Sequence, residues 1–137
     1  MRYLLILFAG AAFSAAEYGG DIKVIANPSV GASSLSTEEL KGVFLATKTS
    51  LSDGSHVEPV LEKSGSTHEE FVRTYLGKTD AALQTYYRSL VFTGKASMPK
   101  ALGSDAEVVA YVAKTKGAIG YVSAGATTAG VKILEVQ

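Results

Sequence analysis

The sequence predicts a single small α/β domain in which a mixed sheet of about four strands is flanked by about four helices. Short β-branched segments alternate with longer segments whose apolar residues recur at helical spacing. Three Ser-x-x-Glu sequences stand directly before such helical patterns, as they do at the start of many helices. Helices that alternate with strands favour a sheet covered on at least one face.

Four segments have the length and composition of strands. They are residues 21–27, 57–61, 118–122 and 131–136. Pro59 lies in the second segment, and because proline has no N–H to donate, it argues for an edge position or a short pairing. The intervening segments 48–55, 95–103 and 123–130 are rich in small and turn-forming residues, so we expect loops there.

Capping residues mark the expected helix starts. Capping boxes are predicted for Ser36 with Glu39, Ser66 with Glu69, and Ser104 with Glu107, and a further helix is predicted to begin at Asp80. Three glycines, Gly77, Gly94 and Gly117, stand where helices are expected to end.

The first 16 residues have the layout of a cleavable secretory signal. Arg2 gives a positive start, residues 4–13 are apolar without a charge, and residues 14–16 are small. The apolar run is much shorter than the roughly 20 residues of a membrane-spanning helix. We therefore predict cleavage after Ala16, export to the periplasm, and one domain at residues 17–137 with no membrane span.

Composition excludes several classes of chemistry. The chain has no cysteine, and its 13 basic and 13 acidic residues create no global basic field for nucleic acid or anionic lipid. His56 and His68 have no metal-ligand spacing, and we expect both to be solvated at the surface. No G-x-S-x-G nucleophile turn is present. We expect neither an enzyme nor a metal or other cofactor.

One segment has the composition of an anion-binding loop. Lys63, Ser64, Gly65, Ser66 and Thr67 form a short run of small residues that leads into an expected helix start. Backbone N–H groups at such a start point outward and the helix dipole favours an anion. In the simpler alternative, Ser66 only caps the helix. The neighbouring acids at positions 62, 69 and 70 oppose a bound anion.

Three stretches together carry a resemblance. They are STEELKGVFLATKTSLSDGS at 36–55, VEPVLEKSGSTHEEF at 57–71 and GAIGYVS at 117–123. The chain resembles the phosphate-binding proteins of ABC importers, in the type II periplasmic solute-binding family. The likeness covers most of residues 21–136 and implies the fold of one lobe, with 63–67 as the loop for phosphate or a similar oxyanion.

The sequence also departs from the family pattern. Family members have two lobes that enclose the ligand, and this chain has the length of one. The family's anion loop reads G-S-G-T after Arg and Asp, whereas only Thr67 of the present tetrad falls in register. Leu61 or Glu62 takes the arginine position, Lys63 takes the aspartate position, and Leu51 replaces the tryptophan of the W-x-D-G turn. A planar guanidinium clamp on phosphate is therefore missing.

Two functions remain open at this point. The first is an oxyanion-binding module that takes part in phosphate transport or sensing with an ABC importer. The second is a cell-envelope interaction protein that keeps the lobe fold without a ligand. Pairing of two copies into a homodimer that rebuilds a cleft is a further open question, since fold alone does not decide function.

Overall fold

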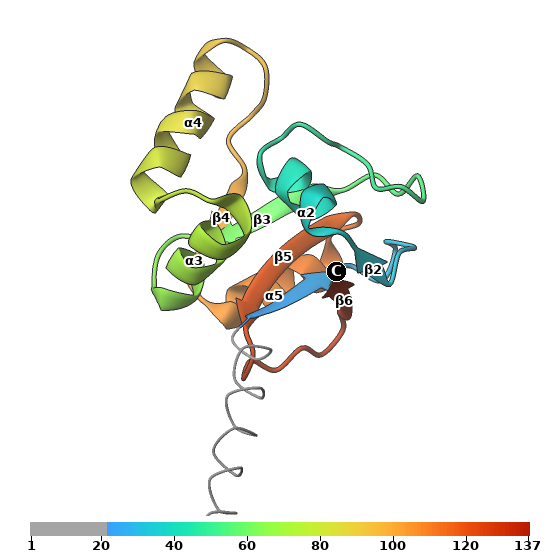
Figure 1. Cartoon of the computed structure of the whole chain (residues 1–137). Helices are drawn as coiled ribbons and strands as arrows, with labels where there is room; N and C mark the ends of the chain where they lie inside the picture. Colours follow the sequence, from blue (N-terminus) through green and yellow to red (C-terminus); the bar gives the residue numbers. More distant parts are fainter. Residues whose placement is uncertain (1–21) are drawn as a thin grey trace, which may run out of the picture.

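The computed structural model describes residues 22–137, and the signal segment predicted at 1–16 lies outside this part of the chain. A six-stranded sheet with the order β2-β6-β1-β5-β3-β4 forms its centre (Figure 1). The strands are β1 (Ile22–Ala26), β2 (Ser34–Leu35), β3 (Glu58–Glu62), β4 (Lys100–Leu102), β5 (Ala118–Ser123) and β6 (Lys132–Val136). The predicted single α/β domain is confirmed. Beyond the four expected strands there are two very short ones, β2 and β4, and β4 lies in the segment 95–103 that was expected to be a loop.

The sheet is mixed. β3 pairs in parallel with both β4 and β5, whereas β1 lies between β5 and β6 and is antiparallel to both. Pairing between β3 and β5 is limited to Glu58 opposite Ala118 and Pro59 opposite Ile119. The short pairing expected from Pro59 is thus confirmed, although β3 is an inner strand of the sheet.

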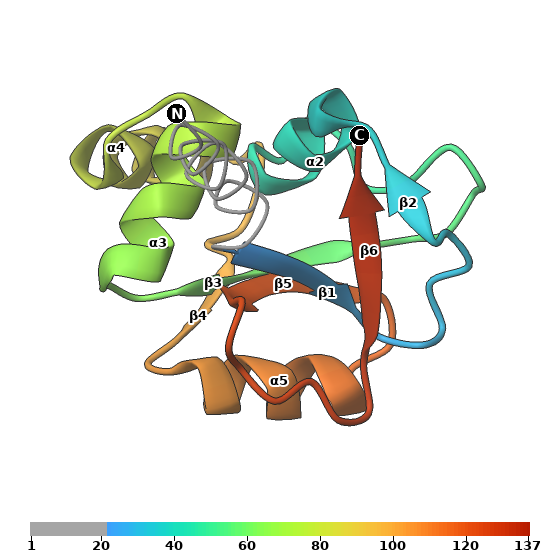
Figure 2. The same ribbon diagram turned by 60° about the horizontal axis from the view of Figure 1, so that its bottom comes forward.

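Helices cover both faces of the sheet. They are α2 (Thr37–Phe44), α3 (Ser66–Phe71), α4 (Asp80–Phe92) and α5 (Asp105–Lys114), and α3 continues as a π-helical segment, η2 (Val72–Leu76). Figure 2 shows α2, α3 and α4 on one side of the sheet and α5 on the other. No helix in the part from residue 22 onward combines the length and apolar character needed to cross a bilayer.

The core is divided by the sheet. The larger cluster packs Phe44, Phe71 and Tyr121 between the sheet and the first three helices. The smaller cluster packs Val60 and Val122 of the sheet against α5. The strands β3, β4 and β5 run in the same direction, so their carboxyl ends lie at one edge of the sheet.

The helix starts follow the sequence in part: the box at Ser36 is complete, whereas at Ser104 the serine caps α5 but the Glu107 carboxylate accepts from the Gly103 N–H instead of the Ser104 N–H. Ser36 and Glu39 form the predicted capping box, and Ser104 Oγ accepts from the Glu107 N–H. Ser66, however, is the first residue of α3 and not its cap, so the predicted box with Glu69 is wrong. Gly65 takes the N-cap position with φ 105° and ψ 172°, and Glu69 N–H bonds to its carbonyl oxygen. Those dihedral angles are accessible almost only to glycine.

Candidate functional site

The carboxyl ends of β3 and β4 form the crevice at which this topology favours a ligand. The chain leaves β3 toward α3 on one face of the sheet and leaves β4 toward α5 on the other face. In open α/β sheets, ligands bind outside the strand ends where neighbouring connections diverge in this way. A hydrogen bond of 2.8 Å from Lys63 N–H to the Leu102 carbonyl oxygen holds the two strand ends together.

The predicted loop residues follow directly after β3, at this edge of the sheet. Lys63, Ser64, Gly65 and Ser66 are exposed and Thr67 is half-buried. A Cβ atom built on Gly65 would meet no heavy atom within 4 Å, so the space beside the backbone is open. The loop therefore offers main-chain donors and hydroxyl groups to a small ligand without obstruction.

The start of α3 lacks the side-chain cap that the other three α-helices of residues 22–137 possess. Ser36, Thr79 and Ser104 each accept a hydrogen bond from a first-turn N–H of their helix. No side chain makes such a bond at α3. Because the first N–H groups of a helix have no partner within the helix, an acceptor from solution can bind there.

Lys63 is the cationic side chain of the loop. Of the two arginines in residues 22–137, Arg73 bonds to Glu70 at 2.8 Å, and Arg88 lies on the outer part of α4. The missing guanidinium clamp noted in the sequence has therefore no substitute from elsewhere in the described chain. The pairing with Arg73 also offsets the charge of Glu70, one of the three acids expected to oppose an anion.

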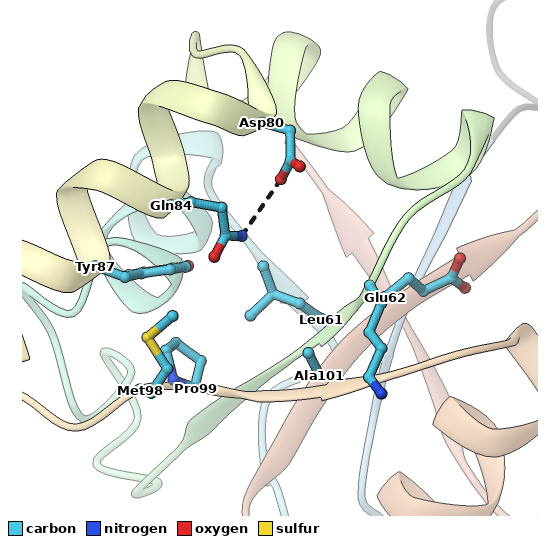
Figure 3. Close-up of a pocket in the computed structure, with 9 residues that line it drawn as sticks. Leu61, Glu62, Asp80, Gln84, Tyr87, Met98, Pro99 and Ala101 are labelled. Atoms are coloured by element: carbon cyan, nitrogen blue, oxygen red, sulfur yellow. Dashed lines mark hydrogen bonds between the residues drawn. The ribbon is translucent and has the colours of Figure 1, made fainter.

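Glu62, another of those acids, is only 7% exposed and points to the opposite side of β3 from Leu61 (Figure 3). Its burial, together with the carboxylate of Asp105, raises the pKa of Glu62 to about 8. Asp105 accepts hydrogen bonds from the backbone N–H and the hydroxyl of Ser123, at 3.3 and 2.6 Å. The neighbouring Glu62 carboxyl group and the hydrogen bonds from Ser123 hold the pKa of Asp105 below its ordinary value. At neutral pH the two carboxyl groups thus carry one negative charge, which lies on Asp105. Contrary to the expectation from the sequence, Glu62 therefore does not oppose an anion.

A buried hydrogen-bond network lies on the α3 side of the same edge. His68 is buried, which contradicts its expected place at the surface. Its Nε2 lies 2.7 Å from Asp80 and its Nδ1 lies 2.5 Å from the Tyr121 hydroxyl, which also accepts the Glu62 N–H at 3.0 Å. Because the Asp80 carboxylate can only accept, Nε2–H of His68 donates to it, and Nδ1 faces the Tyr121 hydroxyl. The hydrogen bond from His68 lowers the pKa of Asp80.

A cavity of about 290 Å³ adjoins the crevice between α4 and the ends of β3 and β4. Figure 3 shows Asp80 and Gln84 directed toward one another above Leu61, with Tyr87, Met98 and Pro99 along the side. Among the predicted site residues, only Lys63 lines this cavity. Because its other titratable lining groups are the carboxyl groups of Glu62 and Asp80, the cavity does not extend the anion loop.

The sequence did not indicate that the starts of α3 and α5 share one edge. Ser104 was predicted as a helix cap. It lies near residues 63–67 only because β3 pairs with the three-residue strand β4. Within residues 22–137, no group of three or more His, Asp or Glu side chains is placed to hold a metal ion.

Comparisons with known proteins define the class of fold. No protein-family model and no curated protein sequence matches this chain. Among solved structures, an ABC-type phosphate transport receptor of Vibrio cholerae matches with a TM-score of 0.64 at 13% identity, over 85% of this chain and 46% of the receptor. PstS of Borrelia burgdorferi matches with a TM-score of 0.63 at 14% identity, over 86% and 47% of the two chains.

A third match is a Clostridium perfringens protein with bound phosphate, described as a phosphate ABC transporter substrate-binding protein. Its TM-score is 0.61 at 18% identity, over 85% of this chain and 45% of that one. The chain therefore has a fold like that of solute-binding proteins. It spans about half the length of the proteins it matches.

Proposed function

We propose that this chain is a non-enzymatic binding module for phosphate or a similar oxyanion, held by Lys63, Ser64, Gly65, Ser66 and Thr67. The observation that carries the proposal is the uncapped start of α3 at the crevice, where the loop is exposed and open. Backbone N–H groups and the positive end of the helix dipole favour an anion at such a place. The fold shared with phosphate-binding proteins supports the same ligand class.

The side chains of the loop add to this backbone site. The hydroxyl groups of Ser64, Ser66 and Thr67 can each donate a hydrogen bond to an oxyanion. Lys63 supplies a positive charge but not the bidentate geometry of arginine. Glu62 is protonated below a pH of about 8 and Glu70 pairs with Arg73, so Glu69 is the one of the three neighbouring acids that keeps an unpaired charge, while Asp105 carries the charge of its pair with Glu62.

The affinity is expected to be modest. In residues 22–137 a single lobe is described, so an anion at this loop stays partly in water, where electrostatic attraction is weakened by solvent and salt. We further propose that the chain is exported to the periplasm after cleavage behind Ala16 and passes its ligand to, or senses it for, an ABC importer. The signal-like residues 1–16 and the fold support this location.

Calorimetric titration and thermal shift with phosphate and with sulfate test the proposal. A ligand at 100 times its Kd raises stability by about 2.7 kcal/mol, which a melting curve resolves. Lys63→Ala should weaken binding and leave the unliganded stability within about 0.5 kcal/mol, as is usual for a surface change. Lys114→Ala, an exposed lysine at the far end of α5, is the matched control and should bind like the wild type.

If the wild type shows neither heat nor a thermal shift at millimolar phosphate and sulfate, the binding proposal is wrong. The cell-envelope interaction protein without a ligand would then be the better reading of this fold. If Lys63→Ala and Lys114→Ala weaken binding equally, the anion binds elsewhere or through general charge only.

A further inference from the structure

The outer end of α4 carries an exposed apolar cluster. Phe92 is 91% exposed, and Val91 and Met98 are 46% and 49% exposed. Ile133 is the one other large hydrophobic residue that is exposed in the part of the chain the structure describes. Large apolar side chains gathered at one place mark a surface for contact with a protein or a membrane. We call Arg88, Val91, Phe92, Lys95 and Met98 the α4 tip.

The α4 tip lies outside the core. α4 is anchored by its first turns, where Leu83 and Tyr87 are buried and the Tyr86 and Tyr87 hydroxyls bond to the Leu45 and Phe44 carbonyl oxygens. Leu90 still packs against the core, whereas the end of α4 projects from the body of the domain before the chain turns back toward β4 (Figure 1). Arg88, Ser89, Val91, Phe92 and Met98 line an open groove of about 560 Å³ there. The apolar cluster therefore forms a projecting corner that nothing in residues 22–137 covers.

The charged side chains of the α4 tip itself, Arg88 and Lys95, are both basic. Acidic residues appear on the domain side of Met98, which shares one cavity with Glu62 and Asp80 and another with Glu58. Residues 81–104 contain Arg88, Lys95 and Lys100 and no acidic residue, although the whole chain is balanced. A second copy of the chain seated on this corner would bring the cations of both tips together without an acid to pair with them. Like charges brought together across an interface oppose association. Tip-to-tip pairing of two copies is therefore disfavoured, and the basic residues of the α4 tip favour an anionic partner.

The size of the cluster distinguishes an anionic membrane from an anionic protein. Three partly exposed side chains offer on the order of a few hundred Å², whereas a stable protein interface buries about 800 Å² on each partner. A bilayer needs no complementary shape, and buried apolar groups and basic residues near anionic headgroups both add to its binding. We propose that the α4 tip makes reversible contact with an anionic lipid surface, in which Val91, Phe92 and Met98 enter the interface and Arg88 and Lys95 face phosphate headgroups.

The absence of tryptophan from the chain allows a direct test. Phe92→Trp places a single indole at the α4 tip and keeps its apolar character. Ile133→Trp, at the half-exposed apolar position on β6, is the control away from the α4 tip. The processed protein is mixed with vesicles of phosphatidylcholine alone or with about one third phosphatidylglycerol. We expect a blue shift and quenching by brominated lipid for Trp at position 92 with the anionic vesicles, and none for Trp at position 133.

Vesicle flotation measures the contribution of each group. Phe92→Ser should lower partitioning onto anionic vesicles about tenfold or more, because a buried phenylalanine side chain contributes at least that factor. The pair Arg88→Glu and Lys95→Glu should abolish binding, whereas Lys114→Glu with Lys116→Glu should have a much smaller effect. Binding of the wild type should weaken with added salt. Melting curves confirm that the exposed substitutions leave the fold intact.

Three outcomes would overturn the proposal. The first is no binding to anionic vesicles, or equal binding by the wild type and Phe92→Ser. The second is a dimer in sedimentation velocity that Phe92→Ser dissolves, which would assign the tip to a second copy. The third is retention on immobilised polyglutamate without vesicle binding, lost in Phe92→Ser, which would assign it to an acidic protein.

Discussion

The hydroxyl oxygen of Tyr121 lies 2.5 Å from Nδ1 of His68, and together they join β5 to α3 inside the core. The same hydroxyl accepts a hydrogen bond from the backbone N–H of Glu62 at 3.0 Å. On its other side, the His68 imidazole bonds to Asp80 at the start of α4. A buried hydrogen-bond network thus fixes the end of β3, where the candidate loop begins.

Removal of that hydroxyl should destabilise the domain. Tyr121→Phe keeps the ring that stacks on Phe71 at 3.9 Å but leaves the Glu62 N–H and a His68 nitrogen without a partner. An unsatisfied buried polar group costs about 1–3 kcal/mol of unfolding free energy. Urea unfolding measures the loss. Tyr111→Phe is the control, because Tyr111 is a half-buried tyrosine on α5 that takes no part in this hydrogen-bond network. It should change stability by less than about 0.5 kcal/mol.

The protonation of Glu62 should make stability depend on pH. Its pKa in the folded state is about 8, above the value of roughly 4.3 in an unfolded chain. Between these values the folded state binds more protons, so stability should fall as pH rises, by at most about 1.4 kcal/mol per unit. Glu62→Gln removes this titration, and its stability relative to the wild type should therefore increase from pH 5 to pH 8.5.

Urea unfolding across this range is the measurement, and Glu58→Gln, an exposed position on the same strand, is the control. The control should keep the slope of the wild type. Parallel stability curves for the wild type and Glu62→Gln would show that Glu62 is already ionised at neutral pH and would remove its contribution to the charge balance of the crevice.

The two serine positions at helix starts should differ in their effect on stability. Ser36 caps α2, so Ser36→Ala should cost about 0.5–2 kcal/mol. Ser66 follows the N-cap of α3, so Ser66→Ala should cost less than about 0.5 kcal/mol. Thermal or urea unfolding of both variants compares them directly. A loss at Ser66 as large as that at Ser36 would indicate that the serine caps α3 after all.

Gly65 should be intolerant of a side chain for reasons of backbone conformation alone. Gly65→Ala meets no neighbouring atom, but φ 105° forces alanine into a region that costs about 1–3 kcal/mol. Gly125 is equally open and has no positive φ, so Gly125→Ala should be neutral within about 0.5 kcal/mol or slightly stabilising. Unfolding curves for the pair test this difference, and equal losses would contradict the Gly65 geometry.

Most of the fold could be predicted from the sequence because local patterns specify it. The apolar periodicity and the caps at Ser36 and Ser104 are local, and the structure reproduces both. β2 and β4 could not be predicted, because segments of two and three residues show no periodicity and exist only through their pairing with β6 and β3. The prediction of a capping box at Ser66 was wrong for a different reason. Gly65 adopts a positive φ and takes the N-cap position one residue earlier.

The surroundings of the candidate site depended on tertiary contacts. Residues 63–67 could be proposed from composition alone. Their neighbours Asp105 and Ser123 come to the same edge only through the parallel pairing of β3 with β4 and β5. His68 has the polar sequence context of a surface residue, and its burial follows from partners on β5 and α4 that are distant along the chain. A raised pKa at Glu62 likewise requires knowledge of which carboxylate lies beside it.

The position of β1 also determines the order in which the domain can be completed. β1 is the first strand described along the chain, yet Val24 pairs with Tyr121 on one side and with Leu134 on the other. Closing loops of that length carries a large entropic cost before any contact repays it, which slows folding. During synthesis, the centre of the sheet therefore stays open until the segment 118–136 has been made.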